Sequence, residues 1–126
     1  MVTSLYLGIL GLLYFWISIE TIMARGKNKV SLGAGENNEI IHLVSAHGNF
    51  SSYAPFFLLA LFLLEQQTVS AYVLHALAAV FVVGRMLHFL TMRNKEQTFK
   101  FRKSAMMLTL WPLIIVSALN IYCSLQ

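Results

Sequence analysis

Four polar side chains that could bind a ligand or take part in a reaction lie inside apolar stretches of the sequence. His47 and Asn49 fall in one such stretch, and Arg85 and His88 fall in the next. An ionisable side chain at the centre of a membrane span costs roughly 2.5–3.5 kcal/mol on insertion scales, so each one needs a physical explanation. A guanidinium beside imidazole and amide groups favours an anion that carries carboxylates, and it favours the nucleophilic thiolate form of a bound thiol. These residues therefore indicate an anion site within a membrane.

The four residues are also predicted to lie at similar depths in the membrane. At a helical rise of ~1.5 Å per residue, His47 and Asn49 lie about 10–14 Å from the start of their stretch, and Arg85 and His88 lie about 8–12 Å from the basic end of theirs. On the earlier stretch, four residues share one stripe at helical spacing: His42, Ala46, Asn49 and Tyr53. Two serines widen this polar face, Ser45 and Ser52. On the later one, Arg85, His88 and Met92 form a second stripe. The pattern predicts a polar pocket between helices, open toward the cytoplasm.

Structural roles for the same residues stay open. Arg85 could pair with Glu20 and so join the first and third stretches, or it could extend to the lipid headgroups. His47 could be a packing histidine, and His75 lies too far from the others in depth to join them. The spacing of His42 and His47 places them about 140° apart on a helix, so it gives no support to a metal site.

Four apolar segments position these residues, at roughly Thr3–Met23, Ile40–Leu64, Val69–Met92 and Ala105–Leu125. Each has about the 20 residues that an α-helix needs to cross ~30 Å of hydrocarbon. A chain of 126 residues that is 58% hydrophobic and only 11% charged carries more apolar surface than a soluble domain of its size can bury. We therefore expect an all-α integral membrane protein, a four-helix bundle that forms one domain over residues 1–126.

The basic residues predict the orientation of the bundle. Apart from Arg85, every Lys and Arg lies in or beside the first loop (Ala24–Glu39) or the third loop (Arg93–Ser104). By the positive-inside rule these loops are cytoplasmic and both termini face the opposite side. The basic residues flank apolar segments and form no patch with exposed aromatics, so nucleic acid is not an expected partner. The single Cys123 excludes an internal disulfide and a site of several thiolates.

Two motifs resemble those of the small bacterial branch of the MAPEG superfamily, the membrane-associated proteins in eicosanoid and glutathione metabolism. The branch has the signature Arg-Ala-His-Gly-Asn-Phe-x-Glu-Tyr-x-Pro, which is similar to Ser45-Ala46-His47-Gly48-Asn49-Phe50-Ser51-Ser52-Tyr53-Ala54-Pro55. Its Gly-Arg-x-x-His motif is similar to Gly84-Arg85-Met86-Leu87-His88. Arg102 falls where the family carries a basic residue at its thiol site. The resemblance implies a MAPEG-like homotrimer in a bacterial inner membrane, with glutathione as co-substrate between subunits near the cytoplasmic face.

The resemblance also implies an activity and residue roles. The expected function is that of a glutathione-dependent transferase or peroxidase, with a lipophilic electrophile or lipid hydroperoxide arriving through the membrane lipid. Arg102 would act at the thiol, Asn49 and Arg85 would hold the ligand, and His88 with His47 would order the network, beside Ser45 and Ser52.

Three positions depart from the family pattern. Ser45, Gly48 and Ser52 stand where glutathione-binding members have Arg, Arg and Glu. The alternative is therefore a non-catalytic binding or structural membrane protein that keeps the fold without an intact glutathione site. Transport through an oligomer is a third possibility.

Overall fold

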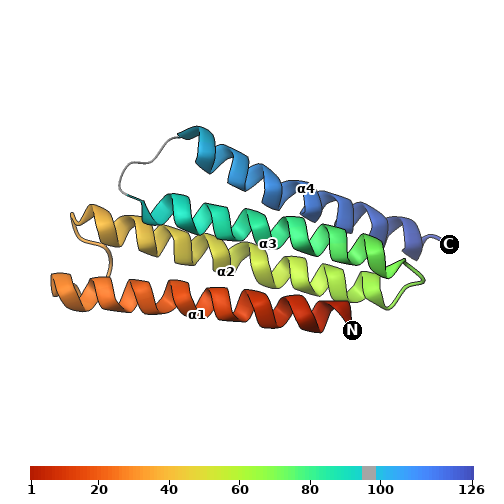
Figure 1. Cartoon of the computed structure of the whole chain (residues 1–126), viewed down its shortest axis with the longest axis horizontal. Coiled ribbons are helices and arrows are strands. Elements are labelled where there is room, and N and C mark those ends of the chain that lie inside the picture. The colour runs from red at the N-terminus through yellow and green to blue at the C-terminus, as the bar shows by residue number, and fades with distance from the viewer. Residues whose placement is uncertain (95–98) are drawn as a thin grey trace.

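The computed structural model describes residues 1–94 and 99–126, and these residues form four helices. The helices are α1 (Val2–Asn28), α2 (Asn38–Glu65), α3 (Ala71–Arg93) and α4 (Phe99–Ser124). All four are long and apolar enough to cross a membrane. They run lengthwise side by side, with both chain termini at one end of the bundle and the first loop at the other (Figure 1). Lys95, which contributes to the predicted positive charge of the third loop, lies outside the described residues.

The predicted spans are confirmed, although each helix begins at another residue than hydropathy suggested, and α4 differs most. Helix α4 begins at Phe99, six residues before the predicted Ala105, so that Arg102 lies within the helix. Helix α3 begins at Ala71, after Ser70. Hydropathy reports only the part of a helix that suits hydrocarbon, whereas backbone hydrogen bonds continue into the polar interface.

Hydrogen bonds at both ends of the α1–α2 pair fix the position of one helix against the other. The Glu65 carboxylate at the end of α2 accepts from the backbone N–H groups of Val2 and Thr3, which are otherwise unpaired donors in the first turn of α1. At the opposite end, Asn37 donates through Nδ2 to Asn28 Oδ1 of α1 at 2.8 Å, and its own Oδ1 accepts from Ile40 N–H at 3.1 Å and caps α2. Helix α1 ends at Asn28, and its C-cap residue Lys29 is left-handed with φ 55°.

Helix α4 lies on the outer side of the bundle and diverges from it at one end. It packs against α3 and α2, and the described residues of α1 and α4 make no contact. Its C-terminal half follows α3 closely, whereas its N-terminal half leans away from the other helices (Figure 1).

Gly84 fixes the crossing of α3 over α4. A Cβ at this position would lie 2.9 Å from the carbonyl carbon of Leu108, which is closer than real side chains approach. Pro112, one turn further along α4, has no N–H to donate to that Leu108 carbonyl. On the other side of α3, the rings of Phe57 and Phe81 stack with centroids 3.9 Å apart and join it to α2.

Large apolar side chains cover the outer surface of all four helices. Examples with more than half of their area exposed are Leu12 on α1, Phe56 on α2 and Trp111 on α4. Such a surface suits hydrocarbon and would aggregate in water. The chain is therefore an integral membrane protein whose helices contact lipid.

Candidate functional site

Arg85 on α3 is the centre of a polar cluster that joins three helices. Its side chain is 1% exposed. The guanidinium donates through Nε to Thr109 Oγ1 on α4 at 2.9 Å and through Nη1 to Asn49 Oδ1 on α2. Its Nη2 group donates to Thr109 Oγ1 and lies 3.4 Å from Met106 Sδ. Arg85 therefore neither pairs with Glu20 nor extends to the headgroups, so both of those alternatives are wrong.

The positive charge of Arg85 has no carboxylate partner among the described residues. Both ion pairs within the described ranges lie near the first loop, and neither includes Arg85. The rings of Tyr53 and Phe81 lie with their centroids 5.5 and 5.9 Å from its Cζ atom, where they give a weak cation–π contact. Neutral partners satisfy the hydrogen bonds of the guanidinium but leave its charge uncompensated in a medium of low dielectric constant. The cluster therefore carries a positive charge inside the bundle.

Arg85 also orients the amide of Asn49. The guanidinium occupies the Oδ1 acceptor of Asn49, so the NH2 group, with its two donors, points away from Arg85. The Asn49 side chain is half-buried, as is that of Tyr53 one turn along α2. The buried charge thus holds the Asn49 amide in one orientation.

One face of α4 carries both the buried partners of Arg85 and the exposed Arg102. Arg102, Met106 and Thr109 follow at i, i+4 and i+7, the spacing of a single helical stripe. Thr109 is 0% exposed, and its hydroxyl also lies 3.2 Å from the Ala105 carbonyl. The sequence reasoning missed Thr109 and Met106 because it considered mainly ionisable groups, although their spacing from Arg102 was available as a signal.

His88 lies on the same stripe of α3 as Arg85. It follows Arg85 by one turn and is 3% exposed. Arg85 contacts Asn49 directly, while Arg102 lies on the stripe of α4 that carries Thr109, near the end of the bundle with the first loop.

The other three predicted site residues lie elsewhere. Ser45 and Ser52 are exposed on α2, and the Ser52 hydroxyl donates to the Gly48 carbonyl at 2.9 Å. His47 packs against the Tyr14 ring of α1, with centroids 5.0 Å apart. The side-chain partners of Arg85 are Asn49, Met106 and Thr109, so the structure does not bring His47 to Arg85.

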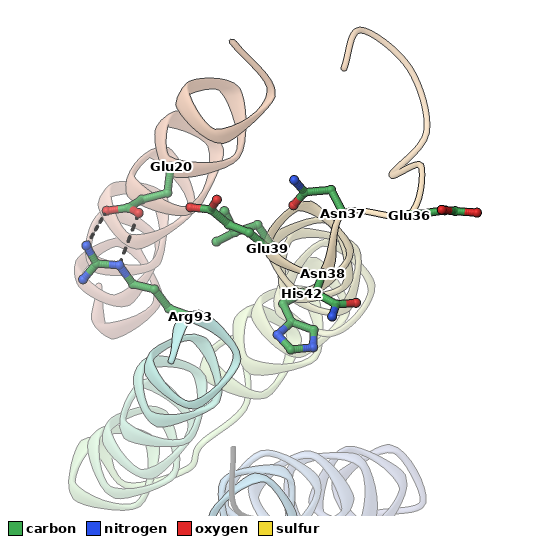
Figure 2. A pocket seen from close by; sticks show the side chains of 8 residues that line it. Glu20, Glu36, Asn37, Asn38, Glu39, His42 and Arg93 are labelled. Carbon is green, nitrogen blue, oxygen red and sulfur yellow. Dashed lines mark hydrogen bonds and ion pairs between the residues drawn. The ribbon is translucent and has the colours of Figure 1, made fainter. Parts of the chain in front are cut away.

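Glu20 belongs to a separate cluster that joins α1 to α3. Its carboxylate pairs with Arg93 Nη2 at 2.9 Å and accepts from Trp16 Nε1 at 3.1 Å. Figure 2 shows Glu20 and Arg93 facing each other across the two helices, with Glu39 pointing from α2 toward α1. The Glu39 carboxylate lies 3.7 Å from Lys27 Nζ.

A cavity of about 630 Å³ opens beside this cluster, and Glu20, Glu36, Glu39, His42 and Arg93 help to line it. Within residues 1–94 and 99–126, no group of three or more His, Cys, Asp or Glu side chains is arranged to hold a metal ion. His75 packs edge-on against the Tyr6 ring, a contact between α3 and α1 at the end of the bundle that carries the termini. The polar chemistry that resembles a ligand site is thus concentrated around Arg85.

Comparison with known proteins gives one result that covers most of the sequence. A model described as the MAPEG family matches residues 3–122. No curated protein matches the chain at a significant level. The matched range covers nearly all of the four helices and every residue of the Arg85 cluster, and so the chain belongs to the MAPEG family.

Proposed function

We propose that this protein is a membrane-embedded, glutathione-dependent transferase or peroxidase that acts on lipophilic electrophiles or lipid hydroperoxides. Membership of the MAPEG family points to glutathione or eicosanoid metabolism. The observation that carries the narrower proposal is the buried Arg85 charge without a carboxylate partner among the described residues. Glutathione is an anion with two carboxylates and a thiol, and it would supply the missing negative charge.

The proposed roles follow from position. Asn49 offers amide donors to a ligand carboxylate, while Arg85 holds that amide and supplies positive potential. His88, one turn from Arg85 on α3, would order this network. Arg102, exposed near the start of α4, would stabilise the thiolate.

The chemistry needs two reactants. With an electrophile, the glutathione thiolate forms a carbon–sulfur bond, and the leaving group departs with its electron pair or the attacked double bond takes up a proton. With a hydroperoxide, the thiolate attacks the terminal oxygen, the O–O bond breaks and an alcohol leaves after protonation. The resulting sulfenic acid condenses with a second glutathione to give the disulfide and water.

The departures at Ser45, Gly48 and Ser52 predict weak binding. Each missing charge-assisted hydrogen bond removes roughly 1.5–3 kcal/mol of binding free energy. A protein with this site would therefore need millimolar rather than micromolar glutathione.

Substitution of Arg102 tests the proposal. We expect detergent-solubilised protein to develop thiolate absorbance when titrated with millimolar glutathione. Arg102→Ala should abolish this absorbance, because the charge that stabilises the thiolate is lost. Lys103→Ala is the matched control, since it removes a neighbouring exposed charge from another face of α4 and should leave the signal intact. Absence of both binding heat and thiolate in the wild-type protein would contradict the proposal.

That negative result would favour the second candidate, a non-catalytic binding or structural membrane protein. Ser45 and Ser52 favour it, because short exposed hydroxyls stand where a glutathione clamp needs charged side chains.

We also propose a homotrimer in a bacterial inner membrane, with the first and third loops cytoplasmic. The resemblance of the two motifs and the positive charge of these loops support this arrangement. Native mass spectrometry from detergent would show a particle of three chains, and a monomer under the same conditions would contradict it.

A further inference from the structure

A second polar cluster lies on the exposed surface near the middle of α1 and α2, on the side of α2 turned away from Arg85. It consists of Tyr14 on α1 and His47 and Ser51 on α2. Tyr14 lies one residue from the midpoint of α1 (Val2–Asn28), and Ser51 lies at the midpoint of α2 (Asn38–Glu65). Tyr14 is 37% exposed, and Ser51 is exposed. Polar groups open to hydrocarbon at this depth are costly unless a partner satisfies them.

The hydrogen bonds within this cluster leave donors unused. The Ser51 hydroxyl donates to the His47 carbonyl at 2.9 Å and lies 3.4 Å from the Tyr14 hydroxyl, which is long for two oxygens. Among the described residues, the Tyr14 hydroxyl has no other hydrogen-bond partner. Within the same ranges the His47 imidazole makes a ring contact with Tyr14 but no hydrogen bond. The phenol hydrogen of Tyr14 and one imidazole nitrogen of His47 are therefore available to a ligand.

An apolar groove between α1 and α2 begins at this cluster. Its first part has a volume of about 430 Å³ and includes Tyr14, Ser51, Gly11 and Leu58 in its lining. A second part of about 360 Å³ shares Leu7 and Leu58 with the first and reaches Met1 and Phe62. From Tyr14 to Met1 the groove extends ~20 Å along α1 at 1.5 Å per residue, enough for a long hydrocarbon chain.

The depth of the polar end limits the chemistry of the occupant. A carboxylate or a phosphate headgroup stays at the membrane interface, because a charge at the bilayer centre is expensive. A neutral carbonyl can reside at this depth and gains a hydrogen bond there. We propose that the α1–α2 groove binds an uncharged lipid with a long apolar chain, such as an isoprenoid quinone, whose carbonyl oxygen accepts a hydrogen bond from Tyr14.

Tryptophan fluorescence in lipid nanodiscs tests this site. In the Trp111→Phe background, Trp16 is the sole tryptophan, two residues from Tyr14. A long-chain benzoquinone is the probe, because quinones quench tryptophan. We expect a saturable quenching component above the linear background from quinone dissolved in the bilayer. Linear quenching alone would overturn the proposal.

A pair of glycine substitutions locates the binding. Gly11 lines the groove and nothing lies within 4 Å of its potential Cβ, so Gly11→Leu fills the groove without an internal clash. This substitution should remove the saturable component. Gly8 is equally unobstructed, and it is absent from the linings of both parts of the groove, so Gly8→Leu should retain the component. Equal quinone binding by both variants would overturn the proposal. A change in the number of protein chains per particle in Gly11→Leu would overturn it too, because the groove would then be a contact between copies of the chain.

Tyr14→Phe tests the hydrogen bond itself while keeping the ring contacts with His47 and Phe50. Quinone binding should weaken about fivefold, the effect of losing one neutral hydrogen bond. An analogue with the same hydrocarbon chain on a ring without carbonyl groups should compete with the quinone equally well in the wild-type protein and in Tyr14→Phe. Unchanged quinone affinity would contradict the assignment. Because no glutathione is present, failure here and failure of the proposed activity remain distinguishable.

Discussion

At the scale of single residues, Arg85 shows how a buried charge is held by neutral partners. Thr109 alone accepts from two nitrogens of its guanidinium, and Asn49 accepts from a third. A buried guanidinium is stable only while its N–H donors are hydrogen-bonded, because an unpaired buried donor loses its hydration without compensation. The site proposed for the anion is for this reason also a contact that joins α2, α3 and α4.

Thr109→Val should therefore destabilise the bundle by about 1–3 kcal/mol, because it keeps the side-chain shape but leaves two Arg85 donors unpaired. The free energy of unfolding can be measured by detergent denaturation. Thr91→Val is the matched control, since the Thr91 hydroxyl bonds to the Leu87 carbonyl of its own helix at 2.7 Å. Equal losses in the two variants would mean that the bonds to Arg85 contribute no measurable stability.

At the scale of helices, the crossing of α3 and α4 decides where the site forms. The backbone of Leu108 fits against α3 only because Gly84 has no side chain, and the next residues, Arg85 and Thr109, are thereby brought within hydrogen-bonding distance. In membranes, small residues at such crossings give close backbone approach, on which helix association depends strongly. A change at Gly84 should consequently affect the site as well as the packing.

We expect Gly84→Ala to cost about 1–3 kcal/mol of unfolding free energy, as overpacking of a tight contact does. It should also weaken any ligand bound near Arg85, since α4 must move outward. Gly8→Ala serves as control: its new methyl group meets nothing within 4 Å, and alanine favours a helix more than glycine does. Unchanged stability in Gly84→Ala would show that α4 adapts without strain.

At the scale of the whole molecule, charge and shape are both asymmetric along the bundle axis. The termini share one end, and the first loop and the start of α4 lie at the other (Figure 1). In the proposed orientation, an anionic ligand would approach from the cytoplasm past Arg102, whereas the proposed carbonyl lipid would enter sideways from the bilayer.

The single cysteine gives a direct test of orientation. Cys123, near the end of α4, should react with a membrane-impermeant maleimide from the non-cytoplasmic side of intact cells, because both termini are expected there. In the Cys123→Ser background, Lys103→Cys should react only after the cells are opened. Labelling in the reverse pattern would overturn the proposed orientation.

The sequence by itself determined the four spans and the presence of charge inside them. Hydropathy over some 20 residues is a local property that does not depend on neighbouring helices, so the spans and both termini at one end of the bundle were predictable. The positions of Arg85 and His88 on one stripe of α3 were predictable for the same reason.

Only the tertiary structure decided which side chains meet. Glu20 looked like a partner for Arg85 but pairs with Arg93, while Thr109, which has no charge, accepts from Arg85. His47 and Asn49 are two residues apart, yet one contacts α1 and the other contacts α3. These choices depend on the rotation of each helix about its axis and on the crossing at Gly84, and the hydrophobic pattern specifies neither, because lipid accepts an apolar residue on any outward face.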